Sequence, residues 1–372
     1  MKSHENLTGK HVVVVGAGYA GLHAALRLAP HVRVTLIAPD GHFTERVRLH
    51  ERAAGRPDVT HPLRELLGPA GVTHVAARVT RIDTGAARVH TDAGPVIGYD
   101  RLVCALGSRT AEATAAEGAA GRLYTAESAP ELRKRLLGGA GALTVVGGGL
   151  TGVELAAELA EFHSGWQVGL VTGGEIAPSV SAKGRAHVRS ALRERGVRIE
   201  EGRRVADHGD LDAEVVVWSA ALVPHTELAV AAGIAVDEDG RIAVDSALRS
   251  VSHPDVYAAG DAASVRTPAA GRLRMACATA LPLGAHVATA VVRDLSGREP
   301  EPVSFGYLLQ CVSLGRHDGI VQPVRADDTP RGAVLTGRPA ALVKERIVRS
   351  TVWALRTAAR HPRLAGHVPG MG

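Results

Sequence analysis

Two segments of the sequence share a glycine spacing that suits the binding of a diphosphate. Both read Gly-x-Gly-x-x-Gly, and each follows a short apolar run. The first glycine of this pattern permits a tight turn, the second lets the backbone approach a pyrophosphate, and the third lets a helix pack against a strand. The helix then points its amino terminus at the anion. The nucleotide-binding candidates are therefore Gly16, Gly18, Tyr19, Ala20 and Gly21 in the first segment and Gly147, Gly149, Leu150, Thr151 and Gly152 in the second.

A carboxylate about 20 residues beyond the first glycine of such a turn usually holds the ribose hydroxyls. In the first copy the nearest acid is Asp40, which is either this ribose ligand in a shifted position or an ordinary turn residue. In the second copy Thr172 occupies the expected position, and Glu175 comes a few residues late. Since no carboxylate there repels a 2′-phosphate, NADPH is allowed beside NADH. We find no adjacent arginine in the sequence that demands it.

A further carboxylate, Asp261, follows an apolar run at 256–259 and the glycine Gly260. A carboxylate at a strand end, beside a glycine that permits close approach, can accept hydrogen bonds from a polyol such as ribitol. The alternative is that Asp261 is the N-cap of a helix, where an acid complements the helix dipole.

The elements around the two glycine turns repeat the order strand, turn, helix, strand. The runs that predict these elements are a strand at 11–15, a helix at 22–29 and a strand at 32–38, then a strand at 143–146, a helix at 153–162 and a strand at 167–172. An alternating stretch from 72 to 103 predicts a small antiparallel layer that ends in a strand at 101–105. Pro282 suits the first turn of a helix that continues through 285–295. The pattern indicates an α/β fold with two Rossmann-like domains.

Composition excludes several classes of protein. Aromatic residues are 3% of the 372 residues and the net charge is +5, with none of the stacking platforms of single-strand binders, so we expect no nucleic-acid partner. No apolar run reaches the ~18 residues of a membrane span and the start is polar, so we expect a cytoplasmic protein. Cys104, Cys277 and Cys311 are widely spaced, so we expect neither a disulfide framework nor a metal site.

The two fingerprints, the Ala-Leu-Gly-Ser of 105–108 and the Ala-Gly-Asp of 259–261, in this order, resemble those of the two-dinucleotide flavoprotein reductases. The tracts 260–268, 313–322 and 349–356 are most similar to type II NADH:quinone oxidoreductases and, more closely, to the ferroptosis suppressor branch related to apoptosis-inducing factor. The resemblance implies FAD in a first domain (1–112 and 236–300), NADH or NADPH in an inserted domain (113–235), and a small C-terminal α+β region (301–372).

The resemblance also implies roles for single residues. Ala105, Gly107, Gly260 and Leu281 would lie at the flavin, and Ala221 stands where relatives often have a glycine near the nicotinamide. Glu154 would orient the nicotinamide carboxamide, unless it is a first-turn acid that complements the helix dipole. Lys344 would lie near the flavin, although a solvated position on a helix is the alternative that we favour.

The implied activity is hydride transfer from NADH or NADPH, through FAD, to a quinone or a similar small acceptor. The alternatives are a reductase of an iron-sulfur protein such as ferredoxin and a non-catalytic nucleotide sensor. The C-terminal stretch 341–360 predicts a basic amphipathic helix, which either docks on the flavin domain, as we favour, or lies on an anionic membrane surface. The sequence leaves the oligomeric state open.

Overall fold

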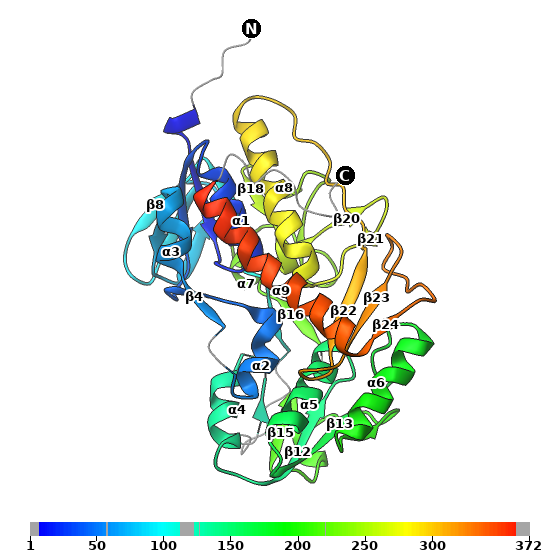
Figure 1. The fold of residues 1–372 in the computed structure, drawn as a ribbon. Coiled ribbons are helices and arrows are strands. Elements are labelled where there is room, and N and C mark those ends of the chain that lie inside the picture. Colours follow the sequence, from blue (N-terminus) through cyan, green and yellow to red (C-terminus); the bar gives the residue numbers. More distant parts are fainter. Residues whose placement is uncertain (1–6, 57–58, 112–122, 126, 220, 362–372) are drawn as a thin grey trace.

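The first domain is built on a five-stranded parallel sheet, whose strands are blue to cyan in Figure 1 except for the yellow-green β18. The computed structural model describes residues 7–56, 59–111, 123–125, 127–219 and 221–361. The strands, in sheet order, are β18 (Val256–Ala258), β9 (Arg101–Cys104), β1 (His11–Val15), β2 (Arg33–Ile37) and β5 (Thr73–Val75). All five residues of β1 are buried, which explains why its valine run shows no polar alternation.

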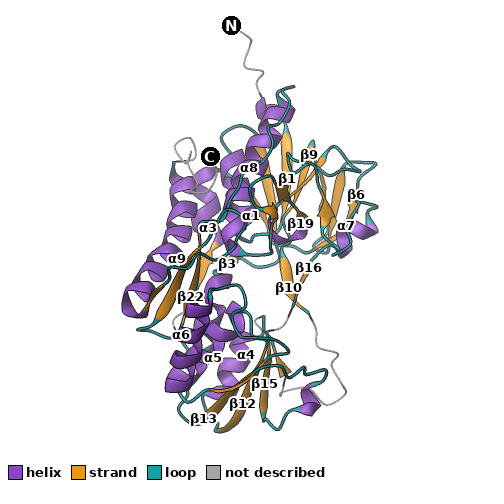
Figure 2. Ribbon diagram, turned by 90° about the vertical axis from the view of Figure 1, so that its right-hand side faces the viewer, coloured by secondary structure: helices purple, strands orange, loops and turns teal. Residues whose placement is uncertain are grey.

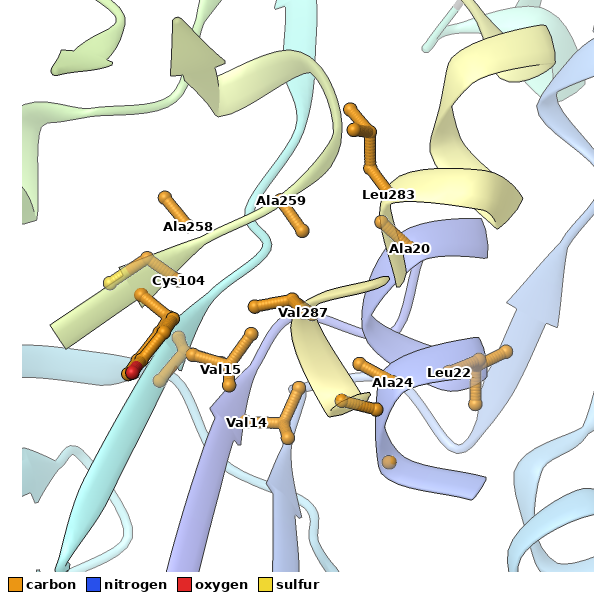
Figure 3. Close-up of a cluster of buried hydrophobic side chains, with 14 of the residues drawn as sticks. Val14, Val15, Ala20, Leu22, Ala24, Cys104, Ala258, Ala259, Leu283 and Val287 are labelled. Carbon is orange, nitrogen blue, oxygen red and sulfur yellow. The ribbon is translucent and has the colours of Figure 1, made fainter. Parts of the chain in front are cut away.

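Two helices lie side by side on this sheet and pack closely on each other. They are α1 (Tyr19–Leu28) and α8 (Cys277–Leu295). A Cβ atom at Gly284 of α8 would lie 2.4 Å from the carbonyl oxygen of Ala20, so only glycine allows this approach. Figure 3 shows the interface, with Ala20 of α1 and Leu283 and Val287 of α8 above the valines of β1.

The start of α8 corrects the prediction made from Pro282. The helix begins at Cys277, so Pro282 lies inside it and not in its first turn. Thr279 helps to form the earlier turn, since its backbone N–H and its hydroxyl both donate to the carbonyl of Ala276.

The inserted domain contains a second five-stranded parallel sheet. Its strands, in sheet order, are β11 (Leu123–Tyr124), β15 (Val215–Trp218), β12 (Gly141–Val146), β13 (Trp166–Val171) and β14 (Arg198–Glu200). Its helices are α4 (Ala129–Leu136), α5 (Leu150–Phe162) and α6 (Ala182–Glu194). The expected pair of Rossmann-like domains is confirmed.

The two domains are joined by a pair of antiparallel strands, β10 (Ser108–Thr110) and β16 (Leu222–Pro224), which Figure 2 shows between the two sheets. After β16 the chain forms α7 (Glu227–Ala231), and Ala229 and Ile234 pack into the core of the first domain. The return crossing therefore comes earlier than the expected boundary at residue 235.

Short elements complete the first domain. They are β3 (His42–Thr44) with β4 (Thr60–Pro62), α3 (Leu63–Leu67), β17 (Ile242–Ala243) with β19 (Ala263–Ser264), β20 (Arg266–Thr267) with β21 (Gly271–Arg272), and the antiparallel sheet of β6 (Val79–Asp83), β7 (Arg88–Thr91) and β8 (Val96–Gly98). The helix α2 (Leu49–Ala53), between β3 and β4 in the chain, packs on α4 and α5 of the inserted domain. The antiparallel layer expected over 72–103 is thus confined to β6, β7 and β8, because β5 and β9 pair in the parallel sheet.

The C-terminal region is an antiparallel sheet covered by a long helix. The sheet contains β22 (Leu309–Ser313), β23 (Gly319–Pro323) and β24 (Leu335–Thr336), and the helix is α9 (Gly337–Arg360). One face of α9 is buried through residues that include Val348, Val352 and Leu355, and the helix crosses α1 (Figure 1). The predicted docking of this helix on the flavin domain is confirmed. Within the described ranges no helix is long and apolar enough to cross a membrane.

Candidate functional site

The first glycine turn follows β1 and fits its expected role. Gly16 has φ +108°, and a Cβ atom there would lie 2.4 Å from the carbonyl oxygen of Ala105 on the neighbouring strand connection. A Cβ atom at Gly21 would lie 2.0 Å from the carbonyl oxygen of Gly16. At Gly18, by contrast, a Cβ atom would meet nothing within 4 Å. Two glycines therefore close the turn, and the third faces open space, as a diphosphate at the amino terminus of α1 requires.

Asp261 is prepared to accept hydrogen bonds from a ligand. It lies in a short 3-10 helix, Gly260–Ala262, whose N-cap is Ala259, so Asp261 is not an N-cap. Its Oδ2 accepts a hydrogen bond of 2.7 Å from the Ser108 hydroxyl, while its Oδ1 is buried and has no partner among the described residues. A buried carboxylate oxygen without a donor is costly. Hydroxyls of a ribityl chain would supply the missing donor, so the residues present fit FAD.

The other flavin candidates surround the same turn. Ala105 and Gly107 follow β9, and Gly107 adopts φ +71°. Gly260 has φ +74°, and a Cβ atom there would lie 3.0 Å from the Cβ of Ala20. Leu281 is buried in the second turn of α8, and its carbonyl is bound at 2.8 Å by Nδ1 of His23.

Two of the candidates lie at the edge of this turn. The buried Tyr19 packs edge-to-face on Phe43 of β3, with ring centroids 4.9 Å apart. Asp40 is exposed just beyond β2. This is the position from which it would reach a ribose, and that role stays a proposal.

The second glycine turn opens into a cavity of about 380 Å³. Gly147 has φ +124°, and a Cβ atom at Gly152 would lie 2.0 Å from the carbonyl oxygen of Gly147, which repeats the geometry of the first turn. Gly149 and Thr172 line the cavity. Leu150 and Thr151 form the first turn of α5 beside it.

Two arginines that the sequence reasoning missed also line this cavity. Arg203 and Arg204 lie in the loop after β14, far from the glycine turn in sequence. They reach the cavity because β14 pairs with β13, so that the carboxyl ends of both strands meet at one edge of the sheet. The sequence reasoning considered only an arginine adjacent to Thr172 in the chain, and these two lie about 30 residues later. An Arg-Arg dipeptide three residues after the end of a short strand is the signal that could have revealed them.

Ala221 lies on the rim of the same cavity, after β15. Its φ of +58° belongs to the left-handed region, which favours glycine. An alanine is strained at this position, in agreement with the expectation that relatives use glycine there.

Glu154 lies at the meeting point of three parts of the chain. It is in the second turn of α5, not in the first, so it does not complement the dipole at the helix start. Its Oε1 accepts a hydrogen bond of 2.9 Å from the backbone N–H of Ser313 and forms an ion pair with Lys344. Its Oε2 is 3.9 Å from Nδ1 of the buried His50. Glu154 is therefore held by β22 and α9, with His50 of α2 beside it.

Lys344 is not the solvated helix residue that the sequence favoured. Its side chain is 13% exposed and is turned inward from α9 toward Glu154. The missing information was the packing of α9 on β22 and β23, which brings Lys344 to α5, because Lys344 and Glu154 are 190 positions apart in the chain.

Burial perturbs the acids and bases beside this cluster. Desolvation, with a smaller contribution from the Lys344 ammonium, lowers the pKa of His50 to about 3, so this imidazole stays neutral. Desolvation also raises the pKa of Glu158, one helical turn beyond Glu154, to about 7, although Arg56 opposes the shift at 3.1 Å. Shifts of this kind are typical of functional sites.

A cleft of about 720 Å³ opens next to the cluster. Lys344 and Ser313 line it, together with the charged residues Arg48, Arg316 and Glu345. Glu158 of α5 also lines the cleft, so a small molecule in it lies beside both Lys344 and the helix that carries Glu154.

The three cysteines are free, and none is suited to thiol chemistry. Burial raises the pKa of Cys104 to about 12, of Cys277 to about 12 and of Cys311 to about 11. Their thiolate forms are scarce at neutral pH. Among the described residues, no group of three or more His, Cys, Asp and Glu side chains is arranged to hold a metal ion.

Comparison with known proteins agrees with this geometry. The family model for pyridine nucleotide-disulphide oxidoreductases matches residues 10–284. An NADH dehydrogenase-like protein of Mycobacterium tuberculosis is 31% identical, with 96% of this chain and 98% of that protein covered. A type II NADH:quinone oxidoreductase of Staphylococcus aureus is 28% identical, with 93% and 96% covered.

Solved structures share the fold at lower identity. The sulfide:quinone oxidoreductase of Aquifex aeolicus has a TM-score of 0.78 at 20% identity, over 95% of this chain and 93% of that one. An NDH2 of Plasmodium falciparum in complex with NADH has a TM-score of 0.78 at 14% identity, over 94% and 96%.

Proposed function

Because the chain belongs to the pyridine nucleotide-disulphide oxidoreductase family, we propose that it passes electrons from NADH or NADPH, through FAD, to a quinone. The chain is an oxidoreductase that carries FAD and uses a pyridine nucleotide, as this family does. The quinone is the part that we propose. The observation that carries it is the Glu154 and Lys344 pair beside a cleft of about 720 Å³.

FAD bound at the first glycine turn supplies the two-electron chemistry that connects nicotinamide and acceptor. Asp261 and the turn at Gly18 hold the cofactor from two directions. Glu154, whose position is fixed by Ser313 and Lys344, orients the nicotinamide carboxamide. Lys344 places a proton donor and a positive charge at the inner end of the cleft, where a reduced quinone oxygen needs both.

Three features support a quinone over other acceptors. The free cysteines with raised pKa values do not favour a disulfide step. The relatives named as type II NADH:quinone oxidoreductases are similar over nearly the whole chain. The charged lining of the cleft favours the polar ring of a quinone over a long apolar tail inside it.

Anaerobic stopped-flow spectroscopy of the purified protein tests this function. We expect NADH to bleach the flavin spectrum rapidly and a soluble quinone such as menadione to restore it within the turnover time. If NADH reduces the flavin but no quinone reoxidises it, the proposal that a quinone is the electron acceptor is wrong. Slow reduction together with slow reoxidation would instead indicate a nucleotide sensor.

We also propose that the outer face of α9 contacts an anionic membrane surface. Leu342 and Trp353 are 65% and 67% exposed on this helix, and Arg346, Arg349 and Arg356 accompany them. Leu342 also lines the cleft, so the cleft would open at the membrane surface, where a quinone dissolved in the bilayer could enter it. Co-sedimentation with phosphatidylglycerol vesicles should fall strongly in the variant Leu342→Ser with Trp353→Ser. Unchanged sedimentation would contradict this contact.

A further inference from the structure

The cavity at the second glycine turn is lined by two arginines, Arg203 and Arg204. They lie on the side where a protein that binds NADH usually has a carboxylate. In dinucleotide folds a carboxylate at the end of the second strand binds the ribose 2′-hydroxyl of NADH, whereas an arginine there accommodates the 2′-phosphate of NADPH. Here the second strand, β13, ends at Val171 and continues into Thr172 and Gly173. Both residues line the cavity, and neither carries a charge.

Arg204 lies directly over this position. A Cβ atom at Gly173 would be 2.8 Å from the Cγ of Arg204 and 3.7 Å from its Nε, so the arginine stem passes across Gly173. Arg204 is exposed, and it makes no hydrogen bond or ion pair with any other residue of the described ranges. Its guanidinium is thus available to a ligand beside Thr172.

Arg203 strengthens the positive potential of the same wall. It is held in place by a 2.7 Å hydrogen bond to Glu200 and a 2.9 Å hydrogen bond to the backbone carbonyl of Asp210. A charge that is already fixed loses little conformational freedom when an anion arrives.

No acid among the described residues lines this cavity to oppose the two arginines. The late acid of the sequence, Glu175, pairs with Arg185 and Arg189 on α6 and does not line it. Of the two acids nearest in sequence, Glu201 is paired with Arg189 and Glu200 with Arg203.

We propose that Arg204, beside Arg203, binds the 2′-phosphate of NADPH and makes this protein accept NADPH at least as well as NADH. The inference rests on the proposed function only in that the cavity receives a pyridine nucleotide. It adds a specificity that the names of the NADH-linked relatives do not carry. Planar guanidinium donors suit a phosphate in geometry as well as in charge.

Titration calorimetry of the FAD-loaded protein with NADP⁺ and with NAD⁺ tests the proposal without turnover. We expect Arg204→Ala to weaken NADP⁺ binding by about ten-fold or more, because a charge-assisted contact is lost, and NAD⁺ binding by less than about two-fold. Arg204→Lys should restore part of the NADP⁺ affinity. Arg193→Ala, which removes an exposed arginine of α6 outside the cavity, is the matched control and should change neither affinity.

Thr172→Glu provides an independent variant, since a carboxylate beside Arg204 should suppress NADP⁺ binding and spare NAD⁺ binding. The proposal is overturned if the wild type binds NAD⁺ but not NADP⁺, or if Arg204→Ala changes both affinities equally. Those outcomes leave the oxidoreductase function intact. If the wild type binds neither nucleotide, the proposed function fails as well.

Discussion

At the scale of single residues, Glu154 is the group on which the proposed chemistry depends most. The backbone N–H of Ser313 and the ammonium of Lys344 both bind its Oε1, and the neutral His50 lies beside its Oε2, so its carboxylate has little freedom to move. A carboxylate that only stabilised its own helix would need none of these long-range contacts. Fixed orientation is what a residue needs if it positions a reacting group, because a misplacement of about 1 Å can cost ~100-fold in rate.

We therefore predict that Glu154→Gln slows reduction of the flavin by NADH or NADPH by about 100-fold and leaves FAD retention unchanged. Glu161→Gln, on the same helix but bound to the Arg316 backbone N–H, is the control and should reduce at the wild-type rate. Single-turnover kinetics without oxygen measure both variants. Equal rates in the two variants, with a lower melting temperature for Glu154→Gln, would assign Glu154 a purely structural role.

Asp261 makes a separate prediction about cofactor retention. The substitution Asp261→Asn replaces one carboxylate oxygen, an acceptor for a ribityl hydroxyl, by an NH₂ group that can only donate. It also removes the negative charge that strengthens the hydrogen bonds to the other oxygen. We expect the dissociation constant of FAD to rise about ten-fold or more, as for loss of a charge-assisted hydrogen bond. The ratio of FAD to protein after gel filtration measures it. Asp255→Asn, which alters an exposed ion pair with Arg101, is the control, and similar FAD loss in both variants would contradict the assignment.

At the scale of secondary-structure elements, the contact between α1 and α8 fixes the position of the glycine turn that precedes α1. Each helix contributes a small residue at the crossing, Ala20 from α1 and Gly284 from α8. The same Ala20 contacts Gly260 next to Asp261. A shift of α8 would therefore displace both groups proposed to bind the cofactor, the glycine turn before α1 and Asp261.

Gly284→Ala tests this helix contact. The added methyl group would meet the Ala20 carbonyl at 2.4 Å, so we expect it to destabilise the protein by about 1 to 3 kcal/mol, the cost of overpacking a core. It should also weaken FAD binding. Urea unfolding curves measure the first effect and fluorescence titration the second. Gly68→Ala, where a Cβ atom meets nothing within 4 Å and φ is −56°, should be neutral or slightly stabilising.

At the scale of the whole molecule, buried histidines make the fold sensitive to acid. Desolvation lowers the pKa of His23 to about 4, and it lowers that of His50 to about 3. In the unfolded chain both groups return to their ordinary value near 6.5. Protons therefore bind the unfolded chain first as the pH falls. The stability from keeping each group neutral is complete above about pH 6.5 and is lost as the pH falls toward the folded value.

We predict that unfolding free energy decreases between pH 7 and pH 5 and that His23 alone accounts for about 2 kcal/mol of the decrease, since 1.5 pH units correspond to roughly that amount. His23→Asn should flatten the pH dependence by this amount. His42→Asn, at an exposed position, should not. Denaturation curves at several pH values provide the slopes, and equal slopes for wild type and His23→Asn would refute the prediction.

Much of the fold was readable from local spacing. The glycines at 16, 18 and 21 and at 147, 149 and 152 specify two turns whose glycine contacts lie within each turn or on the neighbouring strand. The valine run of β1 and the apolar helix after it could be predicted from the sequence without knowing what they pack against. Pro282 misled the prediction of a helix start, because the earlier turn at Cys277 is formed through Ala276 and Thr279 and not through a strong local signal.

What tertiary structure alone decided is which distant groups meet. Ser108 and Asp261 are 153 positions apart, and Glu154 and Lys344 are 190 apart. Arg204 reaches Thr172 only because β14 pairs with β13. A sequence fixes the conformations that arise from neighbouring residues, and so it determined the two nucleotide turns. The partners of Asp261 and Glu154 and the basic wall of the second cavity depend on how the sheets, α9 and α5 pack, because that packing places groups together that share no local pattern.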